Sequence, residues 1–247
     1  MPSTEHDARI AEAVCDLAHR DGENFDSLEL FYDLTTHALA LLPVQCAGIT
    51  VMDERSEVTH VTASDERCRK LEDVQIKLGE GPCVDSVRTD GPLVPALFGP
   101  GTSGNERWPR FAPHAQRAGI TSIAAVPLRA FDTMLGALNL MNARTPAPTA
   151  LDLRVAQAMA STAAAAFLHQ DRIRSQQDIV AQLQGALNSR IVIEQAKGML
   201  SERFRVSVDE AFVRLRGHAR SRRISLSTLA GEIAQGEGPS ELNPAPR

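Results

Sequence analysis

Residues 122–141, SIAAVPLRAFDTMLGALNLM, contain two apolar runs on either side of a turn. The runs, 122–128 and 135–141, consist mainly of aliphatic side chains, and the connection at 129–134 brings in charged ones. Short apolar runs bounded by turn residues are typical of buried β-strands. Because the connection is short, we expect the two strands to pair antiparallel.

Upstream of these runs, the sequence predicts further strands and the helices that flank them. Two β-branched runs, 47–52 (AGITVM) and 58–63 (VTHVTA), flank the polar turn 53–57 and predict a β-hairpin. Prolines and glycines predict a long irregular loop over 95–113. The remaining expected elements are an amphipathic helix at 8–18, a helix from the N-cap Ser27 to Pro43, a helix at 66–74, a helix or turn at 85–89 and a strand at 92–94. Antiparallel strands bracketed by helices indicate an α+β domain.

The C-terminal third of the chain reads as helical. From 150 to 201 there is no proline and little glycine, which predicts a nearly continuous helix. Ser207 with Glu210 forms a capping-box pattern, and Ser225 is placed to cap a last helix. These helices predict a small three-helix bundle. The Pro- and Gly-rich residues 236–247 predict a disordered tail.

The middle of the long helix has a sparse apolar seam. Ile173, Val180 and Leu187 repeat every seven residues, with Leu183 between them. This spacing is typical of a short two-stranded coiled coil and predicts a homodimer. The alternative is a solvated linker helix without a partner.

Charge is divided unevenly along the chain. The net charge is −5, but residues 188–234 hold nine Lys and Arg against five Asp and Glu. This segment therefore carries +4 and the rest of the chain carries −9. A basic module on an acidic body favours a polyanionic partner.

Composition excludes several classes of protein. With 247 residues and 43% hydrophobic content, the chain suits a globular protein of two domains. It has no uncharged apolar stretch of membrane-spanning length and no secretory signal pattern, so we expect a cytoplasmic protein without membrane contact. The four cysteines form no C-x-x-C pair, so neither a metal site nor a disulfide framework is expected.

The C-terminal sequence resembles the ANTAR domain. The matching residues are 194–198 (EQAKG), 210–212 (EAF), 215–216 (LR), Ala219 and 226–230 (LSTLA). The resemblance implies a dimeric antiterminator module of bacterial signal transduction that stabilises paired RNA hairpins. The side chains expected to contact RNA are Arg190, Gln195, Lys197, Arg214, Arg216, Arg220 and Arg223. The family commonly has asparagine where this chain has Arg223.

The preceding region, roughly 25–170, resembles a GAF domain. The matching residues are 78–85 (LGEGPCVD), 106–111 (ERWPRF), 119–122 (GITS), 126–129 (VPLR) and 135–140 (LGALNL). The resemblance implies a sensor that binds a small-molecule effector between its sheet and covering loops, without identifying the effector. The candidate pocket residues are Cys83, Trp108 and Asn139, although Trp108 alternatively anchors its loop.

Together these patterns predict an α+β GAF sensor followed by a helical RNA-binding module. The expected boundaries are an N-terminal helix over 1–24, the sensor over 25–170, a coiled-coil linker over 171–187, the ANTAR domain over 188–235 and the tail over 236–247. We expect no catalysis. One alternative is a GAF-fold thiol enzyme that reduces free methionine sulfoxide, but no cysteine follows Cys83. In another, the C-terminal helices dock a protein partner.

Overall fold

The structure is a computed structural model that describes residues 2–19, 25–53, 57–143 and 146–242. Its first compact unit, Met1–Arg172, is built on a five-stranded antiparallel sheet of strand order β2-β1-β5-β4-β3. The strands are β1 (Cys46–Met52), β2 (Val58–Ala63), β3 (Leu93–Leu97), β4 (Ser122–Ala130) and β5 (Thr133–Asn142). Both expected strand pairs are present: β1 pairs with β2, and β4 with β5. The α+β fold class is confirmed.

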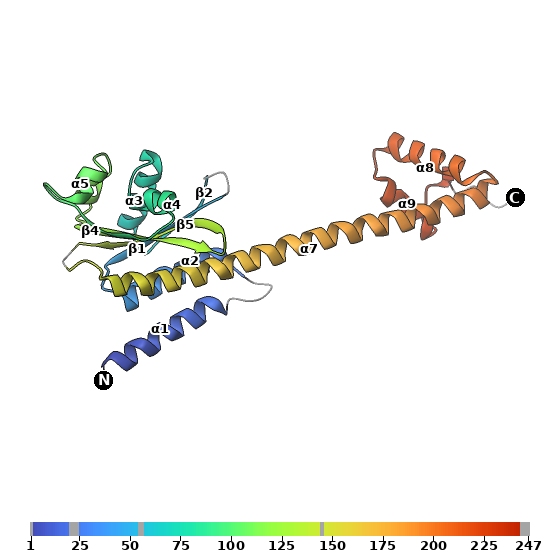
Figure 1. The fold of residues 1–247 in the computed structure, drawn as a ribbon. Coiled ribbons are helices and arrows are strands. Elements are labelled where there is room, and N and C mark those ends of the chain that lie inside the picture. The colour runs from blue at the N-terminus through green and yellow to red at the C-terminus, as the bar shows by residue number, and fades with distance from the viewer. Residues whose placement is uncertain (1, 20–24, 54–56, 144–145, 243–247) are drawn as a thin grey trace. The chain divides into compact units, whose positions relative to one another are not determined.

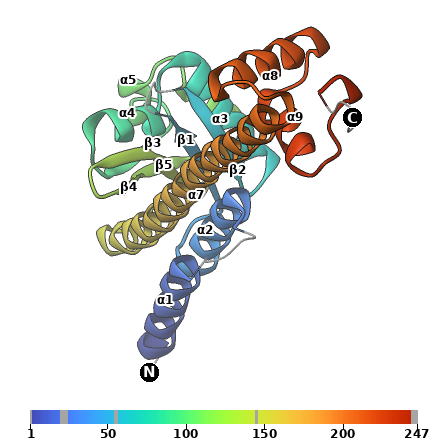
Figure 2. The ribbon, with the colours of Figure 1, turned by 90° about the vertical axis from the view of Figure 1, so that its right-hand side faces the viewer.

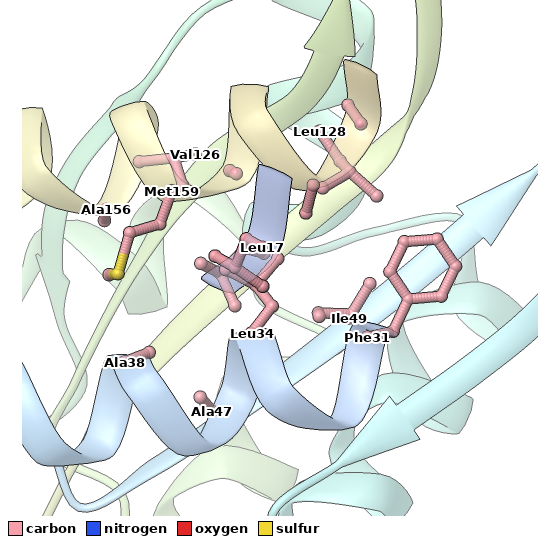
Figure 3. Close-up of a cluster of buried hydrophobic side chains, with 14 of the residues drawn as sticks. Leu17, Phe31, Leu34, Ala38, Ala47, Ile49, Val126, Leu128, Ala156 and Met159 are labelled. Atoms are coloured by element: carbon pink, nitrogen blue, oxygen red, sulfur yellow. The ribbon is translucent and has the colours of Figure 1, made fainter. Parts of the chain in front are cut away.

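One face of the sheet is covered by α1 (Pro2–Ala18), α2 (Ser27–Leu41) and the first part of α7 (Ala150–Phe204) (Figure 1). Alternate strand residues such as Ile49 and Val126 point to this side. They meet Leu17, Leu34 and Met159 from the three helices (Figure 3). This alternation follows from the two-residue period of a strand, which sends neighbouring side chains to opposite faces.

The opposite face carries α3 (Glu66–Leu78), α4 (Pro82–Thr89), α5 (Ser103–Arg107) and α6 (Ala112–Arg117) (Figure 1). Ile123 of β4 packs here with Leu71 of α3 and with the aromatic residues Trp108 and Phe111. These helices and their connections hold the sensor-side residues considered below.

The second compact unit, Ile173–Arg247, contains the end of α7, α8 (Val208–Arg222), α9 (Leu226–Ala234) and a short 3₁₀ helix (Ser240–Leu242). Figure 2 shows α8 and α9 beside the last turns of α7. Buried residues from the three helices, among them Leu200, Leu215 and Ile233, form one core. The expected three-helix bundle is therefore confirmed.

Three local predictions were wrong. Residues 95–113 are not one irregular loop, because they include the end of β3, all of α5 and the start of α6. Ser27 is not the N-cap of α2, because the side chain of Asp26 accepts the hydrogen bond from the Leu28 amide at 2.8 Å. The tail is not wholly disordered, since residue Leu242 is buried in the core of the second unit.

Some of the expected segments extend beyond the described residues. These are residues 20–24 of the N-terminal segment, 54–56 of the first hairpin turn and 243–247 of the tail. Within the described residues, no helix is both long and apolar enough to cross a membrane.

Candidate nucleic-acid interface

The basic side chains of the second unit are placed by the packing of α8. Ala211, Leu215 and Ala219 recur at helical spacing and are buried in the three-helix core. Since these residues occupy the inner face of α8, Arg216 and Arg220 fall on its outer surface, and both are exposed.

Five arginines of this unit are exposed and form no ion pair with a described acidic residue. They are Arg190 on α7, Arg205 after it, Arg216 and Arg220 on α8, and Arg223 at the end of α8. Gln195, on α7, is also exposed. An unpaired guanidinium at a surface keeps all its donors for a phosphate.

Lys197 does not face solvent as the sequence led us to expect. Its side chain is 16% exposed, and its Nζ lies 2.8 Å from Oε2 of Glu194. The ammonium also lies 5.4 Å from the centre of the Phe212 ring. Both contacts hold the lysine side chain against the bundle. Its ammonium is paired with Glu194, one turn earlier on α7, and lies over the ring of Phe212 from α8.

Arg214 is likewise engaged within the bundle. Its Nη2 lies 2.7 Å from Oε1 of Glu210, and its guanidinium lies 5.2 Å from the centre of the Phe204 ring. Ser207 caps α8 as expected, accepting a hydrogen bond from the Glu210 amide at 3.2 Å. The Glu210 carboxylate turns to Arg214 at the next turn of the helix.

Arg223 ends α8 in the left-handed backbone conformation, with φ 55° and ψ 36°. Its amide bonds back to the carbonyl of Ala219, which closes the helix. Asparagine and glycine adopt this conformation more readily than arginine does. A backbone requirement at the helix end therefore explains why asparagine is suited to this position.

Two further arginines bind residues of the C-terminal segment, which the sequence did not predict. Arg222 pairs with Glu241 at 2.8 Å, and Arg203 donates to the backbone carbonyl of Leu242 at 3.1 Å. Leu242 itself inserts into the core. The available signal was a leucine within an otherwise polar tail rich in proline and glycine.

The seam residues of α7 are largely exposed. Val180, Leu183 and Leu187 are 51%, 65% and 58% exposed, whereas Ile173 is half-buried. Ile179 and Ile191, which the heptad prediction omitted, are exposed as well. A single chain thus leaves this stretch of apolar side chains uncovered.

The sensor-side unit contains a closed polar cluster that the sequence did not predict. Glu72 of α3 is fully buried and accepts hydrogen bonds from Thr50 of β1 at 2.9 Å and from Asn139 of β5 at 2.8 Å. Burial without a cationic partner raises the pKa of the Glu72 carboxyl to about 7, and the bonds from Thr50 and Asn139 oppose the shift. The available signal was a glutamate at helical spacing with the apolar residues Cys68 and Leu71.

Two of the expected pocket residues belong to this cluster. Cys83 is the second residue of α4, and its amide donates to Oε1 of Gln75 at 2.8 Å. Gly81, with φ 142°, precedes it, and a Cβ there would collide with the Gln75 side chain. Asn139 and Cys83 are fully buried, and four surface cavities of this unit are lined by other residues.

Trp108 anchors its segment to α4. Its indole Nε1 donates to Oδ2 of Asp85 at 3.1 Å, and Arg107 Nε reaches the same oxygen at 2.8 Å. Glu80 accepts hydrogen bonds from the amides of Arg110 and Phe111 at 2.7 and 3.0 Å. Acidic side chains of the stretch 78–85 therefore hold the stretch 106–111 by accepting its hydrogen bonds.

The buried thiol of Cys83 is poorly placed for thiolate chemistry. Burial, with a smaller effect from the nearby Glu72, raises the pKa of Cys83 well above its ordinary value. A thiol that stays protonated is a weak nucleophile. Among the described residues, no group of three or more His, Cys, Asp or Glu is arranged to hold a metal ion.

Solved structures give likenesses at low identity. The GAF domain of a putative sensor histidine kinase from Pseudomonas syringae pv. tomato is 20% identical, with 73% of this chain and 97% of that chain covered and a TM-score of 0.44. The GAF-B domain of DevS from Mycobacterium smegmatis is 20% identical, with 61% and 99% covered and a TM-score of 0.42. The reduced form of fRMsr of Staphylococcus aureus is 13% identical, with 65% and 94% covered and a TM-score of 0.47. A search of curated proteins gave no match.

Family models match both parts of the chain. The model described as a GAF domain matches residues 26–167, which include the whole sheet, α2 to α6 and the start of α7, but not α1. The model described as an ANTAR domain matches residues 181–233, which include the basic α8 and its neighbours. The chain therefore belongs to the GAF domain family over residues 26–167 and carries an ANTAR domain over residues 181–233.

Proposed function

We propose that this protein is a cytoplasmic transcription antitermination regulator. In this proposal, a GAF sensor controls an ANTAR domain that binds hairpin loops of nascent RNA and prevents terminator formation. The observation that carries it is the set of exposed arginines without an ion pair within the matched ANTAR region, among them Arg190, Arg216 and Arg220. Cations without internal partners are those that gain most from phosphate contacts, because they lose no ion pair on binding.

The chemistry of the module favours recognition of folded RNA over base stacking. The aromatic side chains Phe204 and Phe212 are each covered by a cation, Arg214 and Lys197 respectively. Stacking of single-stranded bases needs open aromatic faces. Arginines on helices instead suit contacts to the phosphates and shape of a structured loop.

We assign the exposed seam of α7 to homodimerisation. Val180, Leu183 and Leu187 lie at coiled-coil spacing and are more than half exposed in one chain. A second copy of the same seam would cover them by knobs-into-holes packing. Two ANTAR domains brought together in this way would present paired surfaces to paired hairpins.

We further propose that the protein acts by binding and not by catalysis. The closed environment of Cys83 and its raised pKa support this proposal over thiol chemistry. An effector, a redox change or a protein partner of the GAF domain would then supply the signal.

A salt titration of RNA binding tests the proposal. The full chain is titrated with a two-hairpin RNA and with the same RNA carrying scrambled loops. We expect tighter binding to the intact loops and an affinity that falls as salt rises, because bound cations release counterions from RNA. Replacement of Arg190, Arg216 and Arg220 together by Gln should reduce the slope of log affinity against log salt by about two, since each lost phosphate contact contributes roughly 0.7 to 0.9.

A matched variant controls for net charge. Arg88→Gln, Arg107→Gln and Arg129→Gln remove three cations from the GAF unit, where Arg88, Arg107 and Arg129 already pair with acids. This variant should keep the affinity and salt slope of the unaltered chain. Equal binding to both RNAs by the dimeric protein would contradict loop recognition, and equal losses in both triple variants would contradict the assigned surface.

A further inference from the structure

A cavity of about 360 Å³ lies between α3 and α6 on the GAF domain. Leu71, Val74 and Ala118 form its apolar part. Its remaining lining side chains are Arg67, Lys70, His114 and Arg117. The volume falls within the range of small-molecule sites, which combine an apolar surface with a few polar groups.

The cavity has no acidic lining residue, although the GAF domain as a whole is rich in acids. The nearest ion pairs are loose and exposed: Arg67 lies 3.4 Å from Asp65, and Lys70 lies 3.8 Å from Glu66. Such surface pairs contribute little to stability. An anion that enters the cavity would therefore break only weak ion pairs when it binds Arg67 and Lys70.

Arg117 and His114 on α6 are arranged as donors. The Nε of Arg117 bonds to the Pro113 carbonyl at 3.1 Å, and its Nη2 lies 3.4 Å from Nδ1 of His114. Because arginine can only donate, Nδ1 of His114 acts as the acceptor in this contact. The ring proton then lies on Nε2, which is left to donate to a ligand.

We propose that the cavity between α3 and α6 binds a small phosphate monoester with an apolar body. Arg67, Lys70 and Arg117 supply three positive charges and His114 supplies a hydrogen-bond donor, which favours a ligand with more than one negative charge. A phosphate monoester carries nearly two negative charges at neutral pH. Guanidinium groups bind phosphate oxygens in a forked geometry. The apolar part of the ligand would cover Leu71 and Val74.

The residues that line this cavity include neither Glu72 and Cys83 of the closed cluster nor any arginine of the ANTAR domain. The proposal does not depend on RNA binding, so its failure would leave the proposed function untouched. It gives the GAF domain a ligand class that its family membership does not specify.

Isothermal titration calorimetry of the full chain tests the site, with 1-naphthyl phosphate as the probe. 1-Naphthol supplies the apolar body without charge, and inorganic phosphate supplies the charge without the body. We expect 1-naphthyl phosphate to bind at least about tenfold more tightly than either, because only it engages both parts of the cavity. Binding should weaken as salt rises.

Arg117→Gln should weaken binding of 1-naphthyl phosphate by about tenfold, the effect of losing one charge-assisted hydrogen bond. The matched control is Lys77→Gln, which removes an exposed cation of α3 that does not line the cavity. Circular dichroism verifies the fold of each variant. If Arg117→Gln does not fold, Lys70→Gln serves in its place, since Lys70 is 72% exposed.

Three results would overturn the site. They are no heat of binding at millimolar 1-naphthyl phosphate, affinity for 1-naphthol equal to that for the phosphate ester, and equal weakening by Lys77→Gln and the cavity variants. Loss of affinity confined to the cavity variants would support it.

Discussion

Glu72 shows how a single side chain can set a pH dependence for the whole GAF domain. Its carboxyl is fully buried, and the groups that contact it are the neutral side chains of Thr50, Asn139 and Gln75. Desolvation of the charged form therefore dominates and places its pKa at about 7, against 4.5 as the ordinary value. The folded state holds the Glu72 proton over a pH range in which the unfolded chain releases it.

From this we predict that the GAF domain loses stability as the pH rises. Between pH 4.5 and about 7 the folded state binds more protons than the unfolded state, so the free energy of unfolding falls across this window. The full loss, about 3 kcal/mol, is present above pH 7. Glu72→Gln should remove most of this slope and be the more stable protein at pH 8. Fluorescence of Trp108, the single tryptophan, follows unfolding of this domain.

The control for this measurement is Glu106→Gln, which neutralises an exposed carboxylate on α5. This variant should keep the pH slope of the unaltered chain. A Glu72→Gln protein with an unchanged slope would show that Glu72 is not the titrating group.

Arg223 carries a second residue-scale prediction, because its backbone adopts φ 55° at the end of α8. Glycine has no Cβ to strain in this conformation, so Arg223→Gly should stabilise the ANTAR domain by roughly 0.5 to 1 kcal/mol. Arg220→Gly, one turn earlier within the helix, should destabilise it by about 1 kcal/mol. Thermal unfolding followed by circular dichroism measures both. The same sign for both variants would contradict the assignment of strain to Arg223.

Residue roles were predicted from sequence where a local rule decides them. The caps Ser207 and Ser225 were predicted because one side-chain oxygen at a helix start satisfies a nearby amide. Ser27 failed because Asp26, one residue earlier, satisfies the same rule. Lys197 failed because its neighbours Glu194 and Phe212 come together only in the folded bundle.

At the scale of elements, the strands of the sheet could be predicted because apolar runs of strand length alternate with turn residues in the sequence. Strands β4 and β5 contain the apolar runs recognised in residues 122–141, each extended by two residues into the turn. The segment 95–113 was not readable as structure, because its order comes from distant groups. Asp85 and Glu80 hold it from α4 and the preceding turn, and no local pattern encodes those bonds.

The seam of α7 carries the element-scale prediction. Val180→Glu would place a carboxylate within the proposed dimer interface, where an unpaired buried charge costs several kcal/mol. We expect a monomer by analytical ultracentrifugation at concentrations where the unaltered chain is a dimer. Ala181→Glu, an exposed neighbour outside the heptad seam, should remain dimeric. A dimeric Val180→Glu protein would show that copies associate elsewhere.

At the scale of the whole molecule, α7 is the element that the two domains share. Its early residues, such as Met159, belong to the GAF core, and its late residues, such as Leu200, belong to the ANTAR core. Between them lies the exposed seam from Val180 to Leu187. The lack of proline predicted this shared helix. The proposed partner of the seam is a second chain, so the structure of one chain does not contain it.

If a dimeric α7 transmits the state of the sensor, the phase of the helix matters more than its length. Each inserted residue turns the helix by about 100°, so seven residues nearly restore the seam and two residues move it to another face. We therefore expect insertion of the heptad Ile173–Ile179, repeated after Ile179, to preserve both dimerisation and binding of the two-hairpin RNA. Insertion of Ala-Ala at the same point should weaken RNA binding about tenfold or more, because the two parts of the seam can no longer face one partner together. Electrophoretic mobility shift and sedimentation measure the two properties in parallel, and equal behaviour of both insertions would contradict transmission through a phased coiled coil.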